Sequence, residues 1–158
     1  MQCRCNKCEF NIEDYKVTGI VAPYNKRSKD LGGFYEIIAP GAFDSVLTKN
    51  ENIIAVLDHS RDSHKILGST QSGTLELRST DQGLEFSLDI AKTSTGTDIV
   101  ELLKRGDLSK MSFAFSLDKG QDSWDFINGE TIRTIRSFKS LHDISIVSNP
   151  AYNDTSVA

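Results

Sequence analysis

Short apolar runs typical of β-strands recur along this 158-residue chain, and three of them carry a side chain that could take part in catalysis. A histidine, His59, ends the run over residues 53–59, while Ser112 and Asp143 lie within two later runs. A base, a hydroxyl and a carboxylate that are far apart in sequence but fixed on separate strands are the components of a serine-type hydrolase. This pattern indicates a strand-rich fold in which distant segments meet at one site.

The remaining pattern predicts a β-dominated α+β fold, with a mostly antiparallel sheet or barrel flanked by a few helices. Alternating residues over 73–78 and 84–90, joined by Asp81-Gln82-Gly83, predict a hairpin. We expect the other strands over residues 15–22, 34–38, 53–57, 110–117, 131–135 and 141–147. Residues 121–130 are expected to form a polar connection with a turn at Asn128-Gly129.

Two helices are expected. The first begins after Pro40 and carries an apolar stripe. The second begins at a capping box formed by Thr95 and Asp98 and ends at Gly106. Together with about eight strands, these helices make the α+β class.

Composition restricts the partners. Apolar residues make up 38% and charged residues 25%, which suits one folded domain. The formal net charge of −4 argues against a nucleic-acid partner. No run of about eighteen apolar residues is present, so we expect no membrane span. The N-terminus lacks the apolar stretch of a signal peptide, which favours an intracellular protein.

The three cysteines, Cys3, Cys5 and Cys8, all lie at the N-terminus. Their odd number and close spacing do not suit a disulfide framework. Thiolates at this spacing could hold zinc, but the segment lacks a fourth ligand, which another part of this chain or another chain would have to supply. We therefore expect no metal, a flexible cysteine-containing segment over residues 1–14, and a single domain over residues 15–158.

Ser112 is the candidate nucleophile. Strand alternation directs Met111 and Phe113 to the core and places Ser112 on the opposite face with Ala114, whose small side chain would leave room for a substrate backbone. Ser109 is the nearest alternative, but it falls in the connection between helix and strand, where a turn or capping role is more natural.

His59 is the candidate base, because a histidine at a strand end can present a neutral imidazole to a cleft. The alternative is a surface histidine, as we expect for His64. Asp58, His59, Asp62 and His64 could also bind a divalent metal, but four ligands on one loop match no metal-site spacing.

Two adjacent residues could orient His59 by accepting from its ring. Because successive side chains alternate between faces, only one of His142 and Asp143 can face the same way as the apolar set. Aspartate is the stronger acceptor and would stabilise the imidazolium. Asp143 could instead pair with a nearby Lys or Arg.

Seven short segments extend this pattern along nearly the whole chain. They span residues 36–43, 56–59, 66–70, 83–86, 103–109, 111–115 and 143–152. In this order they resemble the prohead (capsid-maturation) protease family of tailed bacteriophages, from about residue 17 to 156. The family is similar in fold to the herpesvirus assembly proteases. The cysteine-bearing N-terminus is a departure from the family pattern.

The resemblance implies that His59 is the catalytic histidine, Ser112 the nucleophile and Asp143 the acidic third member. The third member of the herpesvirus proteases is a histidine, which keeps His142 as an alternative. We also expect backbone N–H groups or Arg105 to stabilise the oxyanion.

The function implied is a serine endopeptidase that cleaves the phage scaffold, or the scaffolding segment of the major capsid protein, inside the assembling procapsid in the host cytoplasm. No cofactor is expected, and a homodimer or higher oligomer would allow control by concentration. An extended substrate would bind by backbone pairing. The competing hypotheses are a catalytically silent assembly module of the same fold, and a metal hydrolase built on the 58–64 loop.

Overall fold

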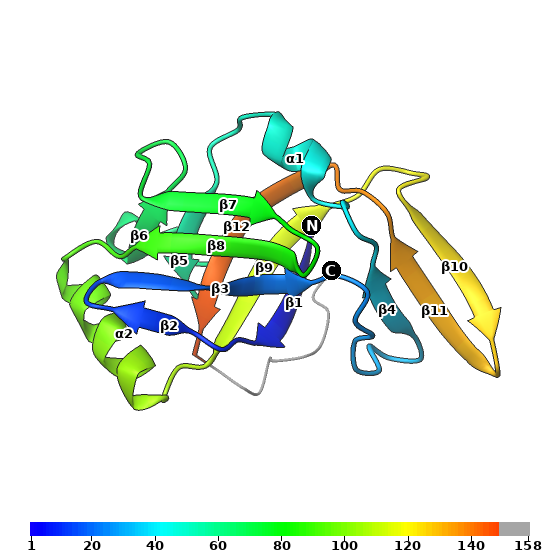
Figure 1. The fold of residues 1–158 in the computed structure, drawn as a ribbon, viewed down its shortest axis with the longest axis horizontal. Coiled ribbons are helices and arrows are strands. Elements are labelled where there is room, and N and C mark those ends of the chain that lie inside the picture. The colour runs from blue at the N-terminus through cyan, green and yellow to red at the C-terminus, as the bar shows by residue number, and fades with distance from the viewer. Residues whose placement is uncertain (149–158) are drawn as a thin grey trace.

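The computed structural model describes residues 1–148, in which three β-sheets are accompanied by two α-helices (Figure 1). The strands are β1 (Gln2–Lys7), β2 (Asn11–Glu13), β3 (Lys16–Pro23), β4 (Tyr35–Ile38), β5 (Ile54–Leu57), β6 (Ile66–Ser69), β7 (Leu75–Ser79), β8 (Gly83–Asp89), β9 (Lys110–Ser116), β10 (Asp122–Ile127), β11 (Glu130–Ile135) and β12 (Ser140–Val147). The helices are α1 (Asp44–Thr48), α2 (Ser94–Arg105) and the 3₁₀ turn η1 (Ser63–Lys65). Strands account for 46% and helices for 14% of the described residues, so the predicted β-dominated α+β class is confirmed. In the described residues, neither α-helix is long and apolar enough to cross a membrane.

A five-stranded sheet, in the order β1-β9-β12-β5-β6, positions the candidate residues. Strand β12 lies between β9, which runs antiparallel to it, and β5, which runs parallel. Ser145 of β12 is thereby opposite Ser112 on one side and Val56 on the other. The end of β5 and the middle of β9 therefore meet across β12, although they are remote in sequence.

A four-stranded sheet, β2-β3-β8-β7, contains the predicted hairpin of β7 and β8 (Figure 1). Its apolar side chains share one buried cluster with those of the five-stranded sheet, including Leu84, Leu88, Phe113 and Ile144, each fully buried. Burying one such side chain stabilises the folded state by roughly 1.5–3 kcal/mol. This shared cluster therefore holds the two sheets together.

The third sheet, β10-β11-β4, contains a strand where we expected a polar connection. Residues 122–127 form β10, which pairs with β11 through the predicted Asn128-Gly129 turn. Both turn residues have positive φ, as a two-residue hairpin requires. The prediction was wrong because β10 has no buried face: Trp124, Phe126 and Ile127 are all more than half exposed.

The N-terminal segment also differs from the expectation of flexibility. Within residues 1–14, β1 pairs with β9 along its whole length, and β2 pairs with β3. Arg4 is buried and donates to both carboxylate oxygens of Glu36, at 2.7 and 2.9 Å, and Arg133 donates to the same carboxylate at 3.3 Å. This buried network joins β1 to β4 and β11, and a local sequence pattern does not reveal it. The division of the chain into domains stays a prediction.

The N-cap of helix α2 lies two residues earlier than predicted. Thr93, rather than the Thr95–Asp98 box, is the N-cap, and its hydroxyl accepts from the Gly96 N–H at 3.0 Å. The predicted end at Gly106 is confirmed, because this glycine adopts the left-handed conformation with φ 86°.

The buried network around Glu36 should contribute several kcal/mol to the free energy of unfolding. In Glu36→Gln, the neutral amide leaves the buried Arg4 without the charge that compensates its burial, while Arg133 keeps its ion pair with Asp122. We expect the free energy of unfolding to fall by about 3–5 kcal/mol, measured by urea denaturation. The exposed control Glu51→Gln should change it by less than about 0.5 kcal/mol. Equal stability of the two variants would contradict this role.

Candidate active site

The structure brings His59, Ser112 and Asp143 into one chain of hydrogen bonds. The Nε2 atom of His59 lies 2.7 Å from the Oγ of Ser112, and its Nδ1 lies 2.6 Å from Oδ1 of Asp143. These lengths are those of good hydrogen bonds, and the second is that of a charge-assisted one. The arrangement is that of a nucleophile, a base and an orienting carboxylate.

A tight turn after β5 places His59. Asp58 and His59 both have positive φ, 51° and 54°, a conformation that costs a non-glycine residue roughly 1–2 kcal/mol. Contacts to β12 and to Ser148, the residue after it, offset this cost. The N–H of Asp58 donates to the Ile146 carbonyl at 2.9 Å, and the Asp58 carboxylate accepts from the N–H and hydroxyl of Ser148 at 2.7 and 2.6 Å. The ring of His59 is thereby directed back over the sheet.

Ser112 is more enclosed than its sequence suggests. Its position on β9 puts it between Cys5 of β1 and Ser145 of β12, and it is only 3% exposed. Ala114, which we expected to leave an open floor, is fully buried as well. The side chains of His59 and Asp143 keep 23% and 15% of their surface exposed, so the site opens to solvent on their side.

A β-bulge separates the two candidates for the third position. The register between β9 and β12 shifts between Leu141 and Asp143, so His142 occupies the irregular position. Asp143 contacts His59, whereas the exposed His142 lies with its Nε2 2.7 Å from the Oγ of Ser116. The geometry therefore favours Asp143 over His142.

Ser145 is a site residue that the sequence reasoning missed. It is fully buried, its hydroxyl donates to Oδ1 of Asp143 at 3.0 Å, and its oxygen accepts from the backbone N–H of His59 at 3.0 Å. It also lies 3.1 Å from Nδ1 of His59. Because Ser145 follows Asp143 by two residues on a strand, period-two alternation could have placed it on the same face.

These contacts define what the groups can do. With Nδ1–H donating to Asp143, the Nε2 atom is left to accept the hydroxyl proton of Ser112. The Asp143 carboxylate accepts from both His59 and Ser145, which fixes its orientation as well as that of the ring. This fixed geometry is what general-base activation of a serine requires.

Two N-terminal cysteines flank this site from β1. Cys3 and Cys5 are opposite Ala114 and Ser112 in the strand register. Burial, together with the negative charge of Asp143, raises the pKa of the Cys3 thiol. Cys8 lies away from these contacts in the apolar core, where burial raises its pKa to about 11. Cys3 and Cys8 are therefore held as protonated thiols at neutral pH.

The remaining predicted residues have other partners. Arg105, two-thirds exposed, forms an ion pair with Asp107 at 3.1 Å, and within residues 1–148 it contacts none of the three site residues. Asp62 accepts from the N–H of His64, which is exposed. Among the described residues, which include the 58–64 loop, no group of three or more His, Cys, Asp or Glu side chains is placed so that it could hold a metal ion. The role of Arg105 stays a prediction.

Comparison with known proteins identifies a family. A model of the caudovirus prohead serine proteases matches residues 3–158, essentially the whole chain. No curated protein and no solved structure showed a significant match. Residues 149–152 of the last resembling segment lie outside the part of the chain that the structure describes.

Substitution of the two candidates for the third position should separate their roles. Asp143→Asn removes the acceptor that holds the reactive tautomer, so we expect the rate of fluorophosphonate labelling of Ser112 to fall by about 10³–10⁴-fold. His142→Asn should change that rate less than about threefold, since it breaks only the contact with Ser116. The reverse ranking would assign the role to His142.

Ser145→Ala tests the supporting hydroxyl. The variant deprives Asp143 of one donor and the His59 N–H of its acceptor, so the labelling rate should fall by about tenfold while circular dichroism stays unchanged. Ser116→Ala, which removes a hydroxyl from the same sheet without touching His59, is the matched control. Equal rates for both variants would exclude a positioning role for Ser145.

Proposed function

Because the chain belongs to the caudovirus prohead serine protease family, we propose that His59, Ser112 and Asp143 are its catalytic triad. We further propose that it cleaves the phage scaffold, or the scaffolding segment of the major capsid protein, during procapsid maturation. The observation that carries the proposal is the hydrogen-bonded chain from Asp143 through His59 to Ser112.

The geometry supports a stepwise acyl transfer. His59 takes the hydroxyl proton as Ser112 Oγ attacks the scissile carbonyl, and Asp143 stabilises the imidazolium that forms. His59 then gives this proton to the leaving amine, and the acyl-enzyme is released by a water molecule that His59 activates in the same way. Backbone N–H groups or Arg105 would stabilise the oxyanion.

The setting of the reaction follows from the family. A prohead protease acts within the assembling procapsid in the host cell, where it is enclosed with the capsid proteins. Confinement raises the local concentration of enzyme and substrate, so formation of a homodimer or higher oligomer in the host cytoplasm would couple activity to assembly. No nucleic acid, membrane or cofactor takes part in the proposed reaction.

Co-expression with scaffold and capsid protein tests the proposal. Intact-mass analysis should find discrete cleavage products with the parent chain and none with Ser112→Ala. Ser109→Ala, a neighbouring serine outside the hydrogen-bonded chain, should cleave like the parent. Loss of activity with a chelator would instead favour a metal hydrolase.

Uncleaved masses with both the parent and Ser112→Ala would contradict the proposed protease and favour a silent assembly module. Cleavage by Ser112→Ala at the parent rate would remove Ser112 from the mechanism. Mapping the new termini of any products would identify the cleaved bonds and the substrate.

A further inference from the structure

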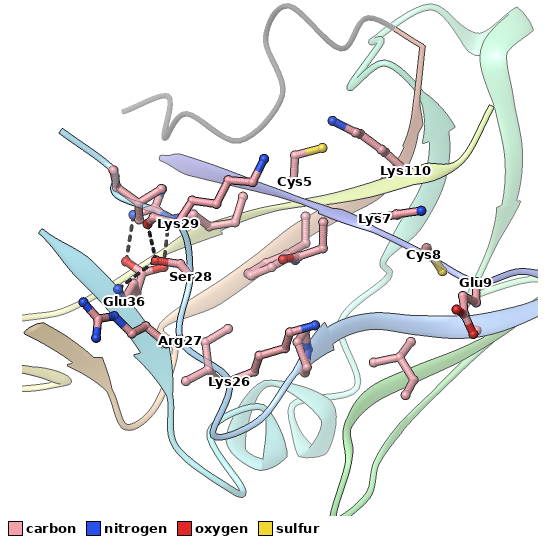
Figure 2. Close-up of a pocket in the computed structure, with 18 residues that line it drawn as sticks. Cys5, Lys7, Cys8, Glu9, Lys26, Arg27, Ser28, Lys29, Glu36 and Lys110 are labelled. Atoms are coloured by element: carbon pink, nitrogen blue, oxygen red, sulfur yellow. Dashed lines mark hydrogen bonds and ion pairs between the residues drawn. The ribbon is translucent and has the colours of Figure 1, made fainter. Parts of the chain in front are cut away.

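A groove of about 750 Å³ adjoins the candidate active site along β1 (Figure 2). One wall is β1 with the start of β9, and the other is the loop between β3 and β4, which carries Lys26 and Lys29. Cys5, which is opposite Ser112 in the strand register, lines the groove, although Ser112 itself does not. The groove therefore passes beside the candidate nucleophile rather than over it.

The lining is strongly basic in a chain whose net charge is −4. Four lysines line it: Lys7, Lys26, Lys29 and Lys110. Of the acidic lining residues, Glu36 is buried against Arg4 and Arg133, so its charge is already compensated. Among the lining residues within 1–148, Glu9 is the one exposed carboxylate. The groove is therefore suited to a negatively charged ligand.

Two of these lysines lie next to the site in the sheet. Lys7 of β1 is directly opposite Lys110 of β9. This pair lies two residues along the strands from the pair of Cys5 and Ser112. Residues two apart on a strand share a face and are separated by roughly 6.6 Å. Lys7 and Lys110 therefore present their side chains on the face of the sheet that carries Ser112.

The opposite wall is held in place before any ligand binds. The N–H of Ser28 donates to the Glu36 carbonyl at 2.9 Å, and the N–H of Glu36 donates to the Ser28 hydroxyl at 2.8 Å. The Asp30 carboxylate accepts from the N–H groups of Gly32 and Gly33, which lowers its pKa. The loop that carries Lys26 and Lys29 is thus tied to β4, and little ordering is needed on binding.

We propose that this groove binds an acidic stretch of the substrate that flanks the scissile bond, an inference that rests on the proposed protease function. An extended peptide crossing Ser112 would bring a side chain two residues from the scissile bond next to Lys7 and Lys110. Acidic residues farther along would meet Lys26 and Lys29. The enzyme would thus select segments with carboxylates on one side of the cut.

Binding to the Ser112→Ala protein tests the groove without cleavage. Fluorescence anisotropy would compare a labelled peptide that contains several glutamates with its glutamine counterpart. We expect the acidic peptide to bind at least about tenfold more tightly at 50 mM salt, with the difference shrinking at 500 mM salt because Lys7, Lys26 and Lys29 are exposed. Equal binding of the two peptides would overturn the proposal.

Charge reversal locates the effect. In the Ser112→Ala background, Lys7→Glu and Lys26→Glu should each reduce the preference for the acidic peptide by about threefold to tenfold. Lys119→Glu makes the same change of net charge at an exposed turn outside the groove and should leave the preference unchanged. An equal loss with Lys119→Glu would also overturn the proposal, because it would show a general charge effect.

The failure of this inference can be distinguished from the failure of the proposed function. Cleavage in co-expression that depends on Ser112, without a preference for the acidic peptide, would leave the protease function intact and exclude the acidic groove. A preference that depends on Lys7, without cleavage by the parent chain, would retain the groove and exclude the protease.

Discussion

The register of β12 between its two neighbours is the constraint on which the site depends. It places Ser145 opposite Ser112 on β9 and Val56 on β5, and the alternation of side chains along the strand keeps the Asp143 carboxylate on the same face as Ser145. A slip by one residue would turn every side chain of β12 to the other face and direct Ile144 toward the base. The hydrogen bonds from the turn after β5 to Ser145 and Ser148 resist such a slip, because they exist only in this register.

Strand β1 connects the five-stranded sheet, which carries the candidate site, to its surroundings. Its alternate residues serve different purposes, because successive side chains face opposite ways. Arg4 points into the protein and joins the buried network around Glu36, while Cys5 and Lys7 share the face that carries Ser112. The network thus fixes the strand that forms one wall of the basic groove, and a change at Glu36 would disturb the groove as well as the stability of the fold.

The predictions from sequence succeeded where a local pattern carries the information. The hairpin of β7 and β8 alternates cleanly, and Gly106 is a direct signal for the end of a helix. Strand β1 was missed because Arg4 anchors it to Glu36, which is 32 residues away in the sequence. No local periodicity in the sequence reveals such a contact. For the site, strand ends and the family resemblance singled out three residues that the structure brings together. Ser145 was overlooked because a serine on a strand gives no sequence signal of a role. Its contacts with His59 and Asp143 follow only from the pairing register of β12.

The order of the strands along the chain has a consequence for biosynthesis. Strands β5 and β9 do not pair with each other, and β12, which lies between them, follows both in sequence. A nascent chain that has reached only Lys139 therefore holds His59 and Ser112 but lacks the strand that joins them. Since chains emerge from the ribosome at about 5–20 residues per second, translation itself sets a delay during which no active site can assemble. The three candidate residues are thus brought together only when nearly the whole of this sequence is free to fold.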